Sequence, residues 1–77
     1  MERQRYYVVL HHREWRIKYD DELYGPYETQ KKALNAAIEA AHRAGSSGAE
    51  AEVIVQGENN YFRTEWTYGE DPYPPPG

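Results

Sequence analysis

Two segments near the start of the chain have the alternating hydrophobic pattern of β-strands. Residues 6–11 form an apolar run rich in β-branched and aromatic side chains, and residues 15–19 alternate between large apolar and basic side chains. Because successive side chains of a strand point to opposite faces of a sheet, this period predicts two strands joined by a tight turn at residues 12–14. The alternation in the second strand also predicts a sheet that is covered on one face only.

The middle of the chain follows the period of a helix instead. Leu34 and Ile38 belong to a row of apolar residues at helical spacing within residues 30–44, which contain neither proline nor glycine. Thr29 directly precedes this segment and is the expected N-cap, because its hydroxyl can accept a hydrogen bond from the first turn. Gly45 directly follows the segment and is the expected C-cap. The pattern predicts one amphipathic helix of about four turns.

The remaining segments predict a connection before the helix and a hairpin after it. Residues 20–28 contain Gly25-Pro26, which is a turn signal, and we expect them to form a loop. Residues 52–56 are rich in β-branched side chains, and residues 57–60 have the composition of a turn. Residues 61–68 return as a second strand, which completes the predicted hairpin.

In chain order these elements predict an α+β fold of two layers with the order β-β-α-β-β. We expect a four-stranded sheet, antiparallel throughout, with its third strand beside the first and the helix packed across one face. The domain is expected to span residues 5–68, between an N-terminal tail at residues 1–4 and an extended proline-rich C-terminal tail at residues 69–77. The aromatic part of its core is expected to come from three side chains: Trp15, Phe62 and Trp66.

The composition narrows the classes of function. A chain of 77 residues supports one thin hydrophobic core, so an interaction module is a better expectation than an enzyme with an enclosed active site. Without cysteine the chain forms neither disulfides nor thiolate metal sites. The histidines His11, His12 and His42 lack the spacing of a zinc site, and we expect no metal and no cofactor. No apolar run approaches the roughly 20 residues of a membrane-spanning helix, and we expect a cytoplasmic protein with no membrane partner.

Several short segments together resemble a known bacterial family. They are Tyr7-Val8-Val9 with His11, Trp15 with Lys18, Thr29-Gln30-Lys31-Lys32-Ala33, Val53-Ile54-Val55 with Gly57, and Tyr68-Gly69 with Asp71-Pro72-Tyr73-Pro74-Pro75. In this order and spacing they resemble the family called domain of unknown function 2188. The resemblance implies a small bacterial domain with the β-β-α-β-β order and no established activity.

The chain departs from the pattern of that family at both hairpins. The family usually has a proline where Leu10 stands and a glycine-bearing turn at residues 12–14, which leaves the geometry of the first hairpin open. In the second hairpin Asn60 stands in place of a glycine. Asparagine tolerates the left-handed conformation better than other side chains, so we expect the second turn to be kept.

Basic side chains on the predicted strands form one candidate site. A formal net charge of −4 argues against a nucleic-acid partner, but the basic residues are concentrated on the strands and the helix. Together with Tyr6 or Tyr61 as stacking platforms, a basic sheet face would suit a single-stranded nucleic acid. The opposed Glu65 would weaken such a face, and an ordinary solvated surface is the simpler reading. The candidate residues for this nucleic-acid-binding face are Arg5, Arg16, Lys18 and Arg63.

The proline-rich tail forms the other candidate site. Its prolines favour the extended polyproline II conformation, which partner domains recognise. Three outcomes are open for the tail: docking on Trp66 or Tyr68, disorder, or use as a ligand by a partner. The candidate partner-binding residues are Pro72, Tyr73, Pro74 and Pro75.

These features favour a non-enzymatic interaction module. We expect the domain to bind a protein partner or to associate with itself, through an edge of its sheet or through the proline-rich tail. The alternative is nucleic-acid binding through the basic, aromatic-bearing sheet face.

Overall fold

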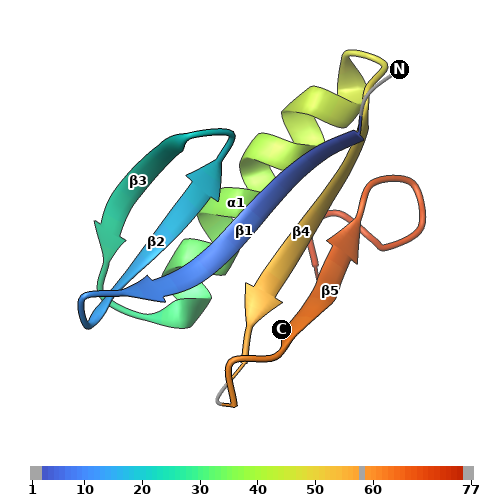
Figure 1. The fold of residues 1–77 in the computed structure, drawn as a ribbon. Coiled ribbons are helices and arrows are strands. Elements are labelled where there is room, and N and C mark those ends of the chain that lie inside the picture. The colour runs from blue at the N-terminus through green and yellow to red at the C-terminus, as the bar shows by residue number, and fades with distance from the viewer. Residues whose placement is uncertain (1–2, 58, 76–77) are drawn as a thin grey trace.

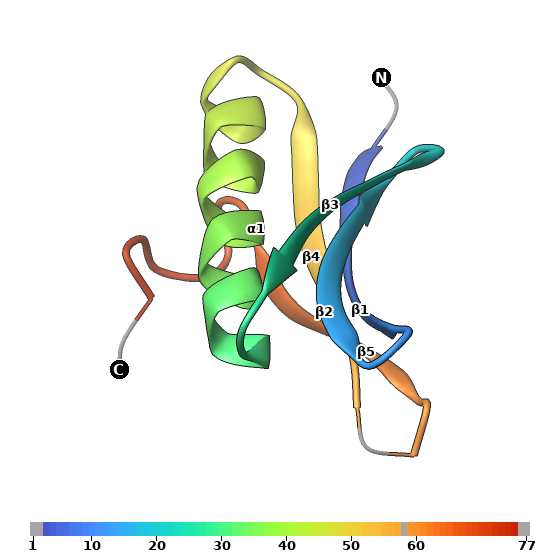
Figure 2. The same ribbon diagram turned by 90° about the vertical axis from the view of Figure 1, so that its left-hand side faces the viewer.

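The computed structural model describes residues 3–57 and 59–75, which form a five-stranded sheet with one helix on one face (Figure 1). In chain order the elements are β1 (Arg3–His11), β2 (Glu14–Tyr19), β3 (Glu22–Tyr27), α1 (Gln30–Ser46), β4 (Glu50–Gln56) and β5 (Phe62–Thr67). The helix and the sheet make the two layers expected of this α+β fold (Figure 2). Within the described part of the chain, no helix combines the length and the apolar character needed to cross a membrane.

The sheet is mixed, with strand order β3-β2-β1-β4-β5, and this corrects the predicted four-stranded antiparallel sheet. The difference comes from β3, which occupies most of the segment expected to be a loop. This extra antiparallel strand reverses the chain once more before α1, so β4 returns beside β1 in the parallel direction. The expected neighbours were therefore right and their relative direction was wrong.

The N-terminal boundary also differs from the expected one. Strand β1 begins at Arg3, so residues 3–4 of the expected tail belong to the sheet, while residues 1–2 lie outside the described residues. Their partners explain this extension, because Arg3 pairs with Glu50 and Gln4 pairs with Ala51 at the start of β4.

Both predicted turns are present and use non-glycine residues in left-handed conformations. The β1–β2 hairpin closes with a two-residue turn of His12 and Arg13, whose φ angles are 51° and 66°. Two consecutive positive φ angles define a type I′ turn, whose twist matches that of the flanking strands. In the second hairpin Asn60 has φ of 62°, and the Gly57 amide donates to the Tyr61 carbonyl at 2.7 Å. Glu58, also part of this predicted turn, lies outside the described residues.

The helix begins where expected and ends later. The Thr29 hydroxyl accepts a hydrogen bond from the Lys32 amide at 3.1 Å, which confirms it as the N-cap. Gly45 is not the C-cap but a buried residue of the last turn, and the positive φ at the helix exit belongs to Gly48. A Cβ atom on Gly45 would lie 2.2 Å from Cγ of Tyr68. Glycine is therefore needed at this position for close packing rather than for a turn.

The core lies between α1 and the central strands. Trp66 is 2% exposed and belongs to it, and Trp15 packs against it from β2. Phe62 is 52% exposed, so its prediction as a core residue was wrong. The reason is a register shift in which Val53 pairs with Trp66 while the next residue of β4 pairs with Thr64. The extra residue in β5 turns Phe62 and Trp66 to opposite faces of the sheet.

Candidate functional site

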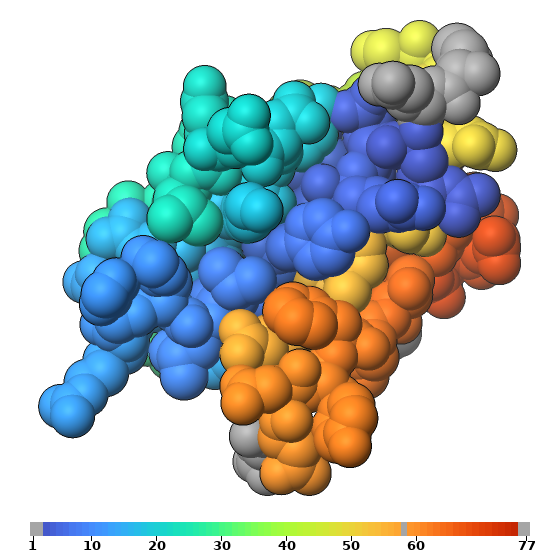
Figure 3. All heavy atoms as spheres, in the orientation of Figure 1, coloured from blue at the N-terminus to red at the C-terminus, as the bar shows by residue number. Residues whose placement is uncertain are grey.

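The sheet face that α1 leaves uncovered is the first candidate surface, and we call it the open face (Figure 3). Val8, Ile17 and Val55 point to the helix side, where they form part of the core. Neighbouring residues of a strand point to opposite faces. The residues next to these three along each strand therefore lie on the open face. Among them, Tyr7 of β1 pairs with Lys18 on β2 and with Ile54 on β4.

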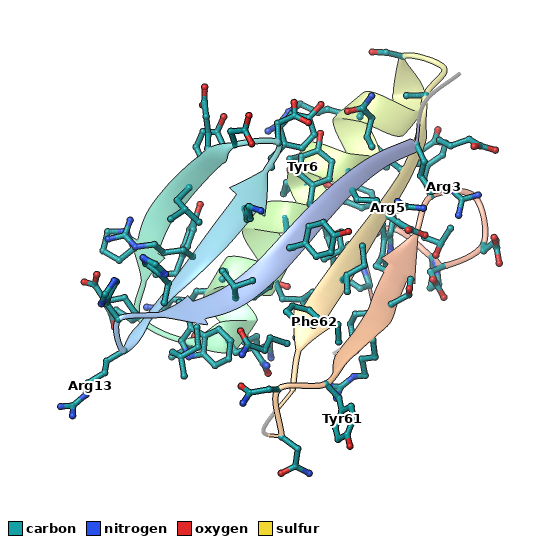
Figure 4. The ribbon with its side chains drawn as sticks, in the orientation of Figure 1. Arg3, Arg5, Tyr6, Arg13, Tyr61 and Phe62 are labelled. Atoms are coloured by element: carbon teal, nitrogen blue, oxygen red, sulfur yellow. The ribbon has the colours of Figure 1, made fainter. Side chains whose placement is uncertain are left out.

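An apolar patch crosses the open face from β1 to β5. The rings of Tyr7 and Phe62 meet edge to face, with centroids 6.2 Å apart and planes at 85°. Ile54 is 8% exposed and pairs with Tyr7 in the strand between them. Figure 4 shows the exposed Phe62 side chain on this face of the sheet. We call Tyr7, Ile54 and Phe62 the aromatic patch.

Three of the predicted nucleic-acid-binding residues share the open face, but two of them contact carboxylates. Arg5 Nε lies 3.0 Å from Glu52 Oε2, and Arg16 Nη2 lies 2.9 Å from Glu14 Oε1. Lys18 has no carboxylate within 4.0 Å among the described residues. Ion pairs within the chain reduce the positive potential available to a phosphate backbone.

The fourth predicted residue lies on the other side. Arg63 pairs with Val55, whose side chain faces the helix, so the register places it away from the open face. Its Nε is 2.9 Å from Glu65 Oε2. Tyr6 is also on the helix side, where its ring stacks on Tyr19 at 4.6 Å and burial raises the pKa of its phenol. The structure therefore groups Arg5 and Arg16 with Lys18, and Tyr7 replaces Tyr6 as their aromatic neighbour.

The C-terminal tail turns back from the end of β5 and docks against α1 (Figures 1 and 2). The Tyr73 ring stacks on His42, with centroids 3.7 Å apart and planes at 9°, and meets Trp66 edge to face at 6.3 Å. The Tyr73 hydroxyl donates a hydrogen bond to Glu39. This bond is the main cause that raises the pKa of the Tyr73 phenol. Of the three outcomes left open for the tail, the structure shows the first, in which the tail docks on the domain.

The backbone around the tail is also held in place. The Trp66 indole donates to the Pro72 carbonyl at 2.9 Å. The Thr67 amide donates to Asp71 Oδ2 at 2.8 Å, and the Asp71 amide donates to the Thr67 carbonyl at 3.0 Å. Pro74 and Pro75 line a groove beside α1, while residues 76–77 of the predicted tail lie outside the described residues. The tail thus covers part of the outer edge of β5.

Both edge strands have features that disfavour pairing with another strand. In β3, Pro26 lacks an amide hydrogen and the pairing with β2 shifts register between Trp15 and Ile17. In β5, the register shift at Glu65 is followed by Thr67, whose amide and carbonyl are occupied by the tail. Bulges, prolines and covering segments are common ways to protect sheet edges. The predicted use of a sheet edge for binding is therefore less suited to this fold than the open face.

The aromatic patch was missed by the sequence interpretation because Phe62 was assigned to the core. One signal was available in the run Val53-Ile54-Val55, where three consecutive apolar residues indicate a strand with apolar side chains on both faces. Its middle residue, Ile54, is the one that lies on the open face.

Comparison with known proteins gives one match. A sequence model of a bacterial family described as "Uncharacterized protein conserved in bacteria (DUF2188)" matches residues 6–68. No curated protein and no solved structure matches the chain.

Proposed function

The chain belongs to DUF2188, a family of uncharacterised bacterial proteins, and we propose that it is a non-enzymatic interaction module that binds a protein partner through its open face. The first candidate for that partner is a second copy of the chain. The observation that carries the proposal is the aromatic patch, in which Phe62 remains 52% exposed. A domain with one thin core would gain stability by burying this ring, so its exposure favours a role in binding. Exposed aromatic side chains next to a buried aliphatic residue are typical of interface centres.

The charged residues around the patch support a specific interface rather than nonspecific hydrophobic association. On one side of the aromatic patch, β2 carries Arg16 and Lys18. Beyond Tyr7, the ion pair of Arg5 and Glu52 joins β1 to β4. A stable interface covers roughly 800 Å² per partner, which is more than the patch alone supplies. Charged residues would therefore form the rim around the apolar centre, as they do in most interfaces.

Sedimentation velocity over a wide range of protein concentrations tests this proposal. We expect a monomer–dimer equilibrium that Phe62→Ser weakens by roughly 30-fold, because a half-exposed phenylalanine buried in each of two copies contributes about 2 kcal/mol. The matched control is Tyr24→Ser, which removes another exposed aromatic ring on the helix side of β3. A protein that stays monomeric at every concentration, or an equal effect of both substitutions, would count against self-association.

Nucleic-acid binding is the second candidate, and Lys18 is the observation that favours it. Lys18 lies beside Tyr7 on the open face and has no carboxylate partner among the described residues. We rank nucleic-acid binding below self-association because Arg5 and Arg16 already pair with carboxylates.

Titration of labelled single- and double-stranded oligonucleotides at low and moderate salt tests this candidate. Binding through the open face would weaken with salt and with Lys18→Ala, whereas Lys31→Ala on α1, with the same charge change, would have little effect. The absence of salt-sensitive binding at low salt would eliminate nucleic-acid binding as a function of the open face.

A further inference from the structure

A groove of about 850 Å³ lies on the helix side of the sheet, between α1, β5 and the docked tail. Its apolar lining comes from Leu34 and Ile38 on α1, Trp66 on β5, and the tail residues Pro72 to Pro75. The groove is partly open to solvent rather than enclosed. Small ligands are usually buried over most of their surface, so an open groove suits an extended chain better.

The charge of the groove is negative. Among the described residues that line it, the carboxylates belong to Glu39, Glu65 and Asp71, and the only cation is Lys31. The open face, in contrast, carries both signs of charge, because Arg5 and Arg16 pair there with Glu52 and Glu14. A ligand of the groove is therefore expected to be positively charged.

Two of these carboxylates are held by hydrogen bonds between the tail and the rest of the domain. Glu39 accepts the hydrogen bond of the Tyr73 hydroxyl, and Asp71 accepts the hydrogen bond of the Thr67 amide. An ionised carboxylate has about four lone-pair sites, so each keeps capacity for a further donor. Preorganised acceptors lower the cost of ordering on binding. Glu65 forms a close ion pair with Arg63 at 2.9 Å and contributes less. Glu39 Oε2 lies 3.9 Å from Arg43 Nη1, a longer and exposed contact that neutralises its charge only in part.

The aromatic lining narrows the ligand to a cation with an apolar stem. One face of the Tyr73 ring is covered by His42, and the ring still remains 39% exposed and lines the groove. Lysine and arginine place long aliphatic stems on apolar surfaces while their charged ends reach polar groups. Such a cation near an aromatic ring gains a further cation–π attraction.

We propose that this groove binds a basic, extended segment of a protein partner, with a lysine or arginine side chain on Leu34 and Tyr73 and its charge near Glu39 and Asp71. The groove and the aromatic patch are on opposite sides of the sheet. This site therefore does not depend on association through the open face, and Phe62→Ser should leave it intact.

Titration of hexalysine, followed by amide and indole chemical shifts and by affinity, tests the proposal at about 0.1 M salt, where the Debye length is roughly 10 Å. We expect shifts at the Trp66 indole and at Leu34, Ile38 and Tyr73, with hexaglutamate causing none. Shifts on the open face, or spread evenly over the chain, would overturn the site.

A matched pair of charge reversals separates this site from general attraction to an acidic protein. Lys31 lines the groove and its neighbour Lys32 does not, although both lie on the exposed side of α1. We expect Lys31→Glu to strengthen hexalysine binding about three- to tenfold, the size of one or two partly exposed ion pairs, and Lys32→Glu to change it less than about twofold. Equal effects of the two substitutions would overturn the proposal.

A second matched pair removes one carboxylate in each variant. Glu65→Gln should weaken hexalysine binding about twofold to threefold, whereas Glu28→Gln, which removes a paired carboxylate outside the groove, should leave it unchanged. Thermal melts of all four variants check that each remains folded. If Glu28→Gln weakens binding as much as Glu65→Gln does, hexalysine responds only to net charge and the site is rejected.

Discussion

Gly45 lies in the last turn of α1 with the aromatic ring of Tyr68 against its Cα atom. An added Cβ would lie 2.2 to 2.5 Å from three atoms of that ring. Two effects of opposite sign compete at this position. Alanine favours a helix over glycine by about 1 kcal/mol, while overpacking a close contact costs about 1–3 kcal/mol. The overlap involves atoms near the base of the ring, so the steric cost is expected to be larger.

We therefore predict that Gly45→Ala lowers the free energy of unfolding by about 1–2 kcal/mol, measured by urea denaturation. The same substitution in a Tyr68→Ala background should raise the stability by up to about 1 kcal/mol, because only the helix propensity then remains. A stabilising effect of Gly45→Ala in the natural sequence would show that Tyr68 does not restrict this turn.

At the scale of elements, the β1–β2 hairpin closes with side chains that are poorly suited to its turn. His12 and Arg13 both have positive φ angles, although neither is glycine, asparagine or aspartate. The left-handed conformation costs an L-residue with a Cβ atom roughly 1 kcal/mol or more. The packing of β1 against β2 and β4 holds the turn in this conformation.

Replacing both residues by Asn-Gly should stabilise the protein by about 1–2 kcal/mol, because this pair is the preferred type I′ turn sequence. Thermal and urea denaturation would measure the gain. Asp21→Gly provides the control, since Asp21 lies in the β2–β3 turn without a positive φ. Glycine at position 21 should not raise the free energy of unfolding. A similar gain at both turns would show that the positive φ angles of His12 and Arg13 are not the cause.

One hydrogen bond of the docked tail depends on a protonated tyrosine. The hydrogen bond to Glu39 raises the pKa of the Tyr73 phenol, so the folded protein holds this proton more tightly than the unfolded chain does. The contribution of this hydrogen bond to stability is then complete below about pH 10, the ordinary tyrosine pKa, and is lost as the pH rises through the raised pKa.

We predict that alkaline titration weakens the docking of Tyr73 and changes the fluorescence of Trp66, which contacts Tyr73 and Pro72. The phenolate absorbance of the natural protein minus that of Tyr73→Phe isolates the titration of Tyr73 from the other tyrosines. Glu39→Gln should return the Tyr73 pKa towards its ordinary value. An unchanged Tyr73 titration in that variant would exclude Glu39 as the cause.

At the scale of the whole molecule, α1 covers one face of the sheet and the tail covers part of one edge. The tail occupies the backbone groups of Thr67 and lies over Trp66, which is 2% exposed. Its removal would expose an aromatic ring and extend the accessible edge of β5. Exposed strand edges favour association with other strands.

Deletion of residues 70–77 is therefore expected to lower the stability by about 1–3 kcal/mol and to produce concentration-dependent oligomers in light scattering. Deletion of residues 74–77 is the control, because it keeps the contacts of Asp71, Pro72 and Tyr73. If both deletions behave like the full chain, the tail does not protect the edge.

Much of the local structure could be predicted from the sequence. The first two strands, the helix with its Thr29 cap and the second hairpin rest on patterns within short segments, and the family resemblance rests on the order and spacing of several such segments. Strand β3 escaped prediction because most of its residues are exposed at the sheet edge and therefore show no apolar alternation. Its Gly25-Pro26 pair has the composition of a loop, and an edge position tolerates it.

The sequence by itself determined the amphipathic helix, the strands with a clear period and the location of the tail, because these depend on side chains a few residues apart. Only the tertiary structure decided the parallel pairing of β1 with β4, the register shift that exposes Phe62, and the contact that requires Gly45. It also decided that the tail docks and forms a groove with α1. Each of these depends on which distant segments meet and in what register. That choice reflects the packing free energy of the whole chain, and no local pattern encodes it.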